Sequence, residues 1–328
     1  MAGEGADSAR HDSAMTTLLP ASSAAIERAA EMLRTGGLVA FPTETVYGLG
    51  ADAASPAAVA ALYAAKRRPR FNPLIAHVAS LEAALREAAL PELARRLAER
   101  FWPGPLTLVA PALETGSVCE LARAGLPSVA LRLPAHPVAR ALIEAFGDPI
   151  VAPSANRSGH VSPVTAEHVM NDLSGEIDLV LDGGRSSEGL ESTIVAFLSE
   201  RPTLLRPGAT PREAIEAALG RELAQAGEAV IAPGMMQSHY APRARLRLDA
   251  LALEPGEVGL DFGGALAAKG EPVALDLSPS GDLKEAAANL FAHLRALDAR
   301  GIARAAVAPI PDHGLGEAIC DRLRRAAS

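Results

Sequence analysis

The hydrophobic pattern of the first two-thirds of the chain alternates between short apolar runs and stretches with helical spacing. Apolar runs bounded by Gly, Pro or polar residues predict β-strands, at residues 38–41, 73–78, 106–110, 128–133, 150–152, 179–181, 193–197 and 203–205. Capping residues followed by apolar positions at helical spacing predict helices, near residues 23–35, 55–68, 80–88, 91–101, 137–146, 165–173 and 211–223. This mixed order predicts an α/β layer fold with a mixed sheet rather than a strict βαβ repeat.

A second unit follows a break in this pattern after about residue 225. Residues 227–243 contain two prolines and no clear period, which is typical of a linker. Beyond them, short apolar runs predict strands at 257–262, 272–277 and 305–310, and an amphipathic helix lies between them, with Leu at 283, 290, 294 and 297. We therefore expect a disordered tail (1–20), a large α/β domain (21–224), a linker or lid (225–243) and a small C-terminal α/β domain of Rossmann-like type (244–328).

The composition is that of a globular protein, with 49% hydrophobic and 21% charged residues among 328. The formal net charge of −8 argues against nonspecific adhesion to nucleic acid, so a phosphate-bearing ligand has to be met by a local basic cluster. No apolar run reaches the ~18–20 residues of a membrane span, and we see no secretory signal. Cys119 and Cys320 lack metal-ligand spacing and are too few for a disulfide framework, so we expect a reducing, cytoplasmic setting.

The segment FPTETVYGLG, residues 41–50, is the most informative stretch of the chain. An apolar run ends at Pro42, and Thr43, Glu44, Thr45 and Tyr47 then bring three hydroxyls and one carboxylate together before two glycines. Glycine lets the backbone turn or approach a ligand closely. In isolation the segment reads as a surface turn, but the polar strand ends further along the chain favour the edge of a binding pocket.

Basic residues cluster where the helix predicted at 55–68 ends. For Arg67 and Arg70, the attraction of cations to a helix C-terminus, about 0.3–1 kcal/mol, explains the position as well as a ligand does. Lys66 and Arg68 lie two residues apart before a Pro-bounded turn that also holds Asn72, and are candidates for binding a triphosphate.

Other polar residues interrupt or end the predicted strands. His77 is either a hydrogen-bonded core residue or a ligand. Arg132 lies inside an apolar run and needs an anionic partner, which could be an Asp or Glu of this chain or the carboxylate of a substrate. The segment VAPSANRSG, with Ser154 and Asn156, reads either as a hydrogen-bonded turn or as groups that bind ribose, base or phosphate. Two more polar strand ends lie at Glu191-Ser192-Thr193 and at Arg206.

Several common motifs are missing from the sequence. It contains no P-loop, dinucleotide fingerprint, HExxH helix or GxSxG elbow. The residues alone therefore predict an α/β protein with a phosphate- or carboxylate-binding cleft.

Taken together, eight blocks of sequence resemble the threonylcarbamoyl-AMP synthase family in its long, two-domain form. Within residues 36–243 they follow the family's order: FPTETVYGLG, KRRPRFNPLIAHV, FWPGPLTLV, SVALRLPAHP, VAPSANRSG, ESTIV, LRPGA and APGMMQSHYAP. The family's K-x-R and S-x-N signatures are Lys66-Arg67-Arg68 and Ser154-Ala155-Asn156 here. Residues 244–328 match only in position and in general α/β character.

The resemblance implies a YrdC-like domain, a twisted open sheet flanked by helices with a basic concave face. Its reaction would join L-threonine, bicarbonate or CO2, and ATP into threonylcarbamoyl-adenylate and release pyrophosphate, with Mg²⁺ accompanying the ATP. The product would feed a separate transferase that modifies adenosine 37 of tRNA, and any direct contact with tRNA would be weak.

The resemblance also assigns residues. Threonine would be held by Thr45, His77, Arg132 and Ser192, with Arg132 taking its carboxylate. ATP would be surrounded by Lys66, Arg68, Asn72, Ser128, the backbone of Ala152, Ser154, Ser162 and Arg206. Asn156 would orient this shell, and the linker around His239 and Tyr240 would close over the cleft as a lid. Some relatives carry basic residues where this chain has Met236-Gln237-Ser238. If those residues hold pyrophosphate in the relatives, the lid of this chain must close differently or bind more weakly.

Two other functions fit parts of the sequence. Hydrogenase maturation enzymes share this domain and a related carbamoyl-adenylate chemistry, but no acylphosphatase-like or zinc-knuckle segment accompanies it here. A double-stranded RNA-binding module would use the basic face without catalysis, and the net charge of −8 argues against it.

Overall fold

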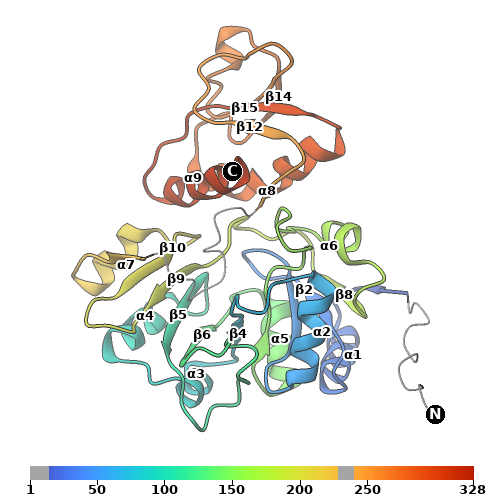
Figure 1. Ribbon diagram of the computed structural model, residues 1–328, viewed down its shortest axis with the longest axis vertical. Helices are drawn as coiled ribbons and strands as arrows, with labels where there is room; N and C mark the ends of the chain where they lie inside the picture. The colour runs from blue at the N-terminus through green and yellow to red at the C-terminus, as the bar shows by residue number, and fades with distance from the viewer. Residues whose placement is uncertain (1–14, 228–239) are drawn as a thin grey trace, which may run out of the picture.

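The computed structural model describes residues 15–227 and 240–328 (Figure 1). An 11-stranded sheet with flanking helices forms the larger domain, and a four-stranded sheet lies in the smaller C-terminal domain. Helices α8 (Leu283–Ala299) and α9 (Leu315–Ala326) lie between the small sheet and the larger domain (Figure 1). The predicted α/β architecture is confirmed.

The large sheet is mixed, in the order β1-β8-β2-β3-β7-β4-β6-β5-β9-β10-β11. Strand β4 runs parallel to β6, for example, whereas β5 runs antiparallel to β6. The strands are β1 (Thr17–Pro20), β2 (Val39–Phe41), β3 (Gly48–Asp52), β4 (Ile75–His77), β5 (Leu106–Pro111), β6 (Ser128–Arg132), β7 (Ile150–Val151), β8 (Leu179–Asp182), β9 (Thr193–Ala196), β10 (Thr203–Arg206) and β11 (Ala224–Gln225).

Several helices of this domain begin where capping residues predict them. Ser22 and Ser55 each accept a hydrogen bond from the backbone amide three residues ahead, at the starts of α1 and α2. The helices are α1 (Ser23–Arg34), α2 (Pro56–Lys66), α3 (Leu81–Glu87), α4 (Glu92–Phe101), α5 (Pro137–Phe146), α6 (Ala166–Leu173) and α7 (Arg212–Leu219).

Helix α2 ends before Pro69 because Arg67 adopts a left-handed backbone conformation, with φ 52° and ψ 40°. The chain reverses there, and the Arg68 amide donates to the Tyr63 carbonyl at 2.9 Å. As a result, Lys66 and Arg68 turn into the protein and are buried.

Two boundaries differ from the sequence-based expectation. Thr17–Pro20 form β1, parallel to β8, so the predicted tail 1–20 is too long; a four-residue edge strand has little signal of its own and is held by pairing. Residues 1–14 lie outside the described part of the chain. Strand β11 pairs with β10 and extends the sheet one residue into the predicted linker.

The glycines of FPTETVYGLG lie in strand β3, which pairs antiparallel with β2, rather than in a turn. A Cβ on Gly50 would lie 2.9 Å from the Phe41 ring, so glycine is needed there for close packing within the sheet. The turn is formed by the preceding residues 43–47, which leaves Glu44 and Thr45 at the strand ends.

The two faces of the sheet differ where β4, β5, β6, β9 and β10 lie. On one face, residues such as Leu131 and Val195 belong to the main core, together with residues of the helices. On the other face, which we call the strand-only face, lies a small cluster of buried residues that all come from these strands: Ile75, Val109, Ala130, Ile194, Ala196 and Leu205. Because side chains alternate along a strand, His77 and Arg132 share this second face with Ile75 and Ala130.

The small sheet is entirely parallel, in the order β12-β15-β13-β14. Its strands are β12 (Arg245–Arg247), β13 (Val258–Asp261), β14 (Val273–Asp276) and β15 (Arg304–Val307), with a 3₁₀ turn η1 (Ala267–Lys269) after β13. Three of these strands and α8 are predicted by the sequence. Strand β12 is not, because only one of its residues is apolar; α9 has helical spacing at 315, 319 and 323 that could have revealed it.

The domains share a buried apolar cluster. Val46 and Leu190 of the larger domain and Tyr240 of the linker belong to the same cluster as Leu290 and Phe291 of α8. In the described ranges, no helix combines the length and the apolar composition that crossing a bilayer needs.

Candidate functional site

One pocket gathers most of the predicted site residues at the end of the strand-only face of the large sheet. It is lined by Thr45, Val46, Arg68, Ile75, His77, Arg132, Ala152, Pro153, Ser154, Glu191, Ser192, Arg206 and Tyr240. These include all four residues predicted to bind threonine, four of the eight predicted to bind ATP, and Tyr240 of the predicted lid. His239 lies outside the described residues.

Arg132 is held by the FPTETVYGLG segment. At the end of β6, its guanidinium donates to the Glu44 carboxylate at 2.6 Å and to the Thr45 hydroxyl at 3.0 Å. Burial alone would raise the pKa of Glu44, but Arg132 outweighs it and lowers this pKa. A Glu of this chain is therefore one anionic partner of Arg132, and the pair keeps the guanidinium in place at the pocket wall.

His77 is a neutral imidazole in this pocket. It lies beside Arg132 in the register of β4 and β6 and packs edge-on against Phe41. Burial, followed by the charge of Arg132, lowers the pKa of His77 to about 3. Among the described residues its Nδ1 has no hydrogen-bond partner, so it is available to a ligand.

Ser192 is fixed from two sides just before β9. Its hydroxyl lies 2.7 Å from the hydroxyl of Thr107 on β5. Arg206, at the end of β10, donates to the Ser192 carbonyl at 2.8 Å. Gly208 allows this arrangement, because a Cβ there would lie 2.4 Å from the Glu191 carbonyl oxygen.

Lys66 holds the backbone that carries Ser154, a residue of the pocket lining. Its ammonium donates to the backbone carbonyls of Ser154 and Asn156, and burial lowers its pKa well below the usual value. Lys66 does not line the pocket, whereas its neighbour Arg68 does. Arg68 donates to the Pro73 carbonyl at 3.2 Å, and burial lowers its pKa to about 10.

The other predicted residues surround the pocket without lining it. The Asn156 amide donates to the carbonyls of Arg157 and His160 and so shapes its own loop. The Ser162 hydroxyl donates to Glu191 at 2.7 Å, and Asn72 is buried in the turn after α2. Ser128 begins β6, so it lies about 13 Å from Arg132 along the same strand face.

The sequence-based assignment gives no role to several residues of the site, among them Glu44, Thr107 and Glu191. Each is buried and polar, and each contacts a predicted residue. Glu44 and Glu191 stand next to predicted residues in conspicuously polar segments, which is a signal that could have found them. Thr107 sits in an ordinary apolar strand and offers no such signal.

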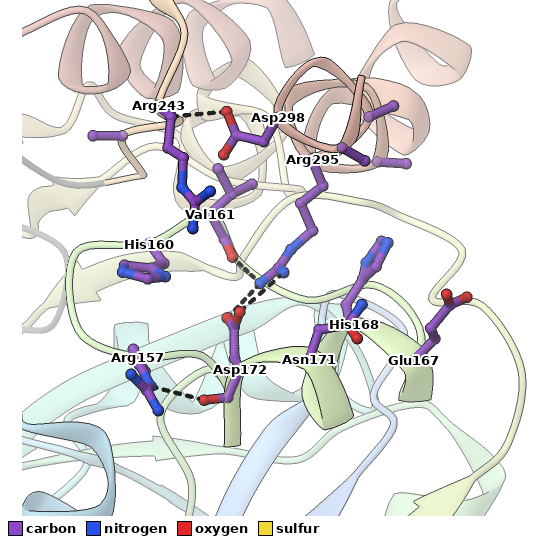
Figure 2. Close-up of a pocket in the computed structure, with 14 residues that line it drawn as sticks. Arg157, His160, Val161, Glu167, His168, Asn171, Asp172, Arg243, Arg295 and Asp298 are labelled. Carbon is purple, nitrogen blue, oxygen red and sulfur yellow. Dashed lines mark hydrogen bonds and ion pairs between the residues drawn. The ribbon is translucent and has the colours of Figure 1, made fainter. Parts of the chain in front are cut away.

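A larger cavity of about 650 Å³ lies between α6 and α8 at the domain junction, compared with about 50 Å³ for the pocket above. Figure 2 shows Arg295 reaching across this larger cavity to Asp172, with Arg243 and His160 on one side. Its most buried charges, Arg295 and Asp172, already neutralise each other at 2.7 Å. Since its described lining contains no predicted site residue, we assign the site by chemistry to the smaller pocket.

Among the residues that the structure describes, no group of three His, Cys, Asp or Glu side chains could hold a metal ion. The two carboxylates at the pocket, Glu44 and Glu191, are engaged by Arg132 and Arg322. The pocket thus presents mainly cations, hydroxyls and a neutral imidazole, which is a lining suited to anions.

The chain matches two families along its length. Residues 31–208 match the family named for Sua5, YciO and YrdC and described as "Telomere recombination". Residues 210–328 match the family described as "Threonylcarbamoyl-AMP synthase, C-terminal domain". The threonylcarbamoyl-AMP synthases of Pyrococcus abyssi and Bacillus subtilis are 43% and 42% identical to the chain, covering 92% of it in both cases and 94% and 92% of the relatives.

A solved structure agrees with these matches. The crystal structure of Pyrococcus abyssi Sua5 complexed with L-threonine has a TM-score of 0.85 and 38% sequence identity, covering 95% of this chain and 97% of that one. Both family models match in order along the chain, and the relatives match over nearly their full length. The chain therefore belongs to the threonylcarbamoyl-AMP synthase family in its two-domain form.

Proposed function

We propose that this chain synthesises L-threonylcarbamoyl-adenylate from L-threonine, bicarbonate or CO2, and ATP, with release of pyrophosphate. The single observation that carries the proposal is the convergence of Arg68, Arg132 and Arg206 with hydroxyls and a neutral imidazole in one buried pocket. Membership of a family named for this reaction, and the L-threonine in the solved relative, support it.

Threonine would occupy the Arg132 end of the pocket. Arg132 would take the substrate carboxylate while Glu44 holds the guanidinium in position. Thr45 and Ser192 offer hydroxyls for the amino acid, and the neutral His77 offers a hydrogen bond without adding charge. This arrangement would place the threonine amine toward the remainder of the pocket.

ATP would lie along the strand-only face toward the other cations. Arg68 and Arg206 line the pocket with Ser154, and Ser128 lies further along the same face as Arg132. Lys66 would act through the backbone that it holds at Ser154 and Asn156. Asn72 and Ser162 complete the proposed set around the nucleotide.

The chemistry needs no covalent enzyme nucleophile. The threonine amine adds to CO2, so that a nitrogen–carbon bond forms and a proton is released. An oxygen of this carbamate then attacks the α-phosphorus of ATP; a phosphorus–oxygen bond forms as the bond to the β-phosphate bridging oxygen breaks, and pyrophosphate leaves with the electron pair. The protein would contribute by holding two anions together and stabilising the charge that develops on phosphorus.

Mg²⁺ would enter with ATP, held by phosphate oxygens and water, because the described residues offer it no carboxylate cluster. Tyr240, which lines the pocket, would help to exclude water as part of a lid. We place the reaction in the cytoplasm, where the adenylate would pass to a separate transferase that modifies adenosine 37 of tRNA, with weak contact to tRNA at most.

The test is to identify the product by mass spectrometry after incubation with ATP, threonine and bicarbonate. We expect threonylcarbamoyl-adenylate, and pyrophosphate release that depends on both threonine and bicarbonate. Pyrophosphate release at the same rate without threonine would contradict the proposal. Incubation with D-threonine controls for nonspecific carbamate formation, since carbamates form in solution from either enantiomer.

A further inference from the structure

A single arginine of the C-terminal domain reaches into the wall of the pocket. Arg322, on α9, is fully buried. Its Nε donates to Glu191 Oε2 at 2.8 Å, and its Nη2 donates to the Pro207 carbonyl at 2.9 Å. Both acceptors belong to the larger domain, and Glu191 lines the pocket beside Ser192.

The same guanidinium also holds the linker. Its carbon lies 5.2 Å from the centroid of the Tyr240 ring, and this ring stacks on Phe291 of α8 with centroids 5.5 Å apart. Tyr240 therefore lines the pocket and contacts two side chains of the C-terminal domain, Arg322 and Phe291. An arginine over an aromatic face contributes more when both are shielded from water, as here.

Glu191 links Arg322 to the rest of the pocket. One carboxylate oxygen accepts from Arg322 and the other accepts from Ser162 at 2.7 Å. Burial would raise the pKa of Glu191, but Arg322 and then Arg206 outweigh it and hold this pKa at about 2. Tyr240 and Asp321 also interact with this cluster, and Asp321 forms an ion pair with Arg322 as well.

The loop that carries Glu191 and Ser192 also contacts the C-terminal domain through Gly189 and Leu190. A Cβ on Gly189 would lie 2.4 Å from the Ala287 carbonyl oxygen of α8, so only glycine allows this approach. Leu190 is buried in the cluster that contains the core of the C-terminal domain. Arg322 thus acts at the point where a loop already anchored on α8 enters the pocket.

We infer that Arg322 is a positioning residue through which the C-terminal domain sets the geometry of the pocket, by fixing Glu191 and Tyr240. The inference rests on the proposed function, because the pocket is that of the proposed synthase. It assigns the C-terminal domain a part in shaping the threonine end of the site. The competing explanation is that Arg322 merely fastens the two domains together.

Another contact between the domains separates these explanations. Arg212 of α7 donates to Glu317 of α9 through a bidentate pair, and neither residue lines the pocket. A variant of Arg212 therefore weakens the same domain interface, on the same helix α9, without touching Glu191 or Tyr240. It is the matched control.

The experiment compares R322M, R322K and R212M with the wild type as full-length chains, measuring kcat and KM for threonine and ATP. We expect R322M to lower kcat/KM for threonine at least about tenfold, since it leaves a buried carboxylate without its main partner, and R212M to stay within about twofold. R322K keeps the charge but loses the planar contact with Tyr240 and the fork geometry, so we expect an intermediate loss of about three- to tenfold.

The dependence of kcat/KM on pH separates the two explanations further, because a residue that only joins the two domains would not change it. In R322M, Arg206 is the cation that still lowers the pKa of Glu191 among the described residues. This pKa therefore rises, and the acid limb of kcat/KM for threonine moves to higher pH. R212M leaves this limb in place. R322K also tests the inference if R322M does not fold, because it keeps the buried charge: threonine kinetics in R322K equal to those of the wild type would overturn the inference.

Equal losses in R322M and R212M, with unmoved acid limbs, would likewise overturn it. The outcome for the proposed function is separate. A wild-type chain that forms no threonylcarbamoyl-adenylate contradicts the function, whereas an active wild type with R322M behaving like R212M contradicts only the role of Arg322.

Discussion

Arg132 and Glu44, 88 positions apart in the chain, form a buried ion pair with an N–O distance of 2.6 Å at the wall of the pocket. The carboxylate leaves part of the guanidinium for Thr45 and for a second anion. A guanidinium fixed in this way is preorganised for a substrate carboxylate, because little side-chain entropy remains to be lost on binding.

Replacing Arg132 by Met should weaken threonine binding much more than ATP binding. Loss of a carboxylate–guanidinium pair in a buried site costs about 2–5 kcal/mol, and calorimetry with each substrate measures it. The variant also leaves Glu44 unpaired, so we expect the double variant R132M/E44Q to recover stability but not threonine affinity. Unchanged threonine affinity in R132M contradicts the assignment, and R140A, an exposed ion-pair variant on α5, is the control.

Replacing Thr107 by Val should raise the KM for threonine with little effect on that for ATP. The substitution preserves shape but removes the hydroxyl 2.7 Å from that of Ser192, a bond worth about 0.5–1.5 kcal/mol. Steady-state kinetics measure the effect. T203V, on β10 two strands away from β5 and partly exposed, should leave both KM values unchanged. Equal KM values for T107V and wild type would show that the Thr107 hydroxyl does not position Ser192 for threonine.

Replacing Lys66 by Met should destabilise the protein and weaken ATP binding. The change leaves the carbonyls of Ser154 and Asn156 without their donor, at about 1–3 kcal/mol each, and loosens the turn that brings Ser154 to the pocket. Urea unfolding and ATP calorimetry measure the two effects. In the matched control K269M, the lost ammonium donates to the Leu251 carbonyl from an exposed position, so both quantities should stay near wild type. Wild-type ATP affinity in K66M would mean that Lys66 plays no part in nucleotide binding.

Replacing His77 by Gln should flatten the dependence of stability on pH in mildly acidic solution. The folded-state pKa of His77 is about 3, against 6.5 for an exposed histidine, so between these values the unfolded state binds the extra proton. The stability contribution is present above pH 6.5 and is lost as the pH falls toward 3, which amounts to about 2 kcal/mol at pH 5.

Urea unfolding at pH 7 and pH 5 checks this prediction in both proteins. The pKa of His168 is also lowered, to about 4, but His168 is present in both proteins and cancels in the comparison. H313Q, at an exposed position, is the control. A fall in stability from pH 7 to pH 5 that is as large in H77Q as in wild type would show that His77 is protonated in the folded state.

Much of the fold was predictable because its signals are local. Ser22 and Ser55 cap their helices through the amide three residues ahead, and apolar runs such as 106–110 become strands almost unchanged. The predictions fail where pairing or packing between distant segments decides the structure. Thr17–Pro20 is a strand because β8 lies beside it, and Gly50 lies in a strand because β2 pairs with that segment, where Phe41 leaves no room for a Cβ.

The site divides in the same way. The polar groups at strand ends can be recognised from local pattern, and the ordered motifs around Thr45, Lys66, Ser154 and Ser192 are enough to place the chain in its family. Which charges pair depends on the three-dimensional arrangement: Glu44 pairs with Arg132, and Glu191 with Arg322, 131 positions away. Capping and periodicity depend on neighbours within a few residues, whereas a buried charge takes its partner from whatever the fold brings near, and no local pattern records that choice.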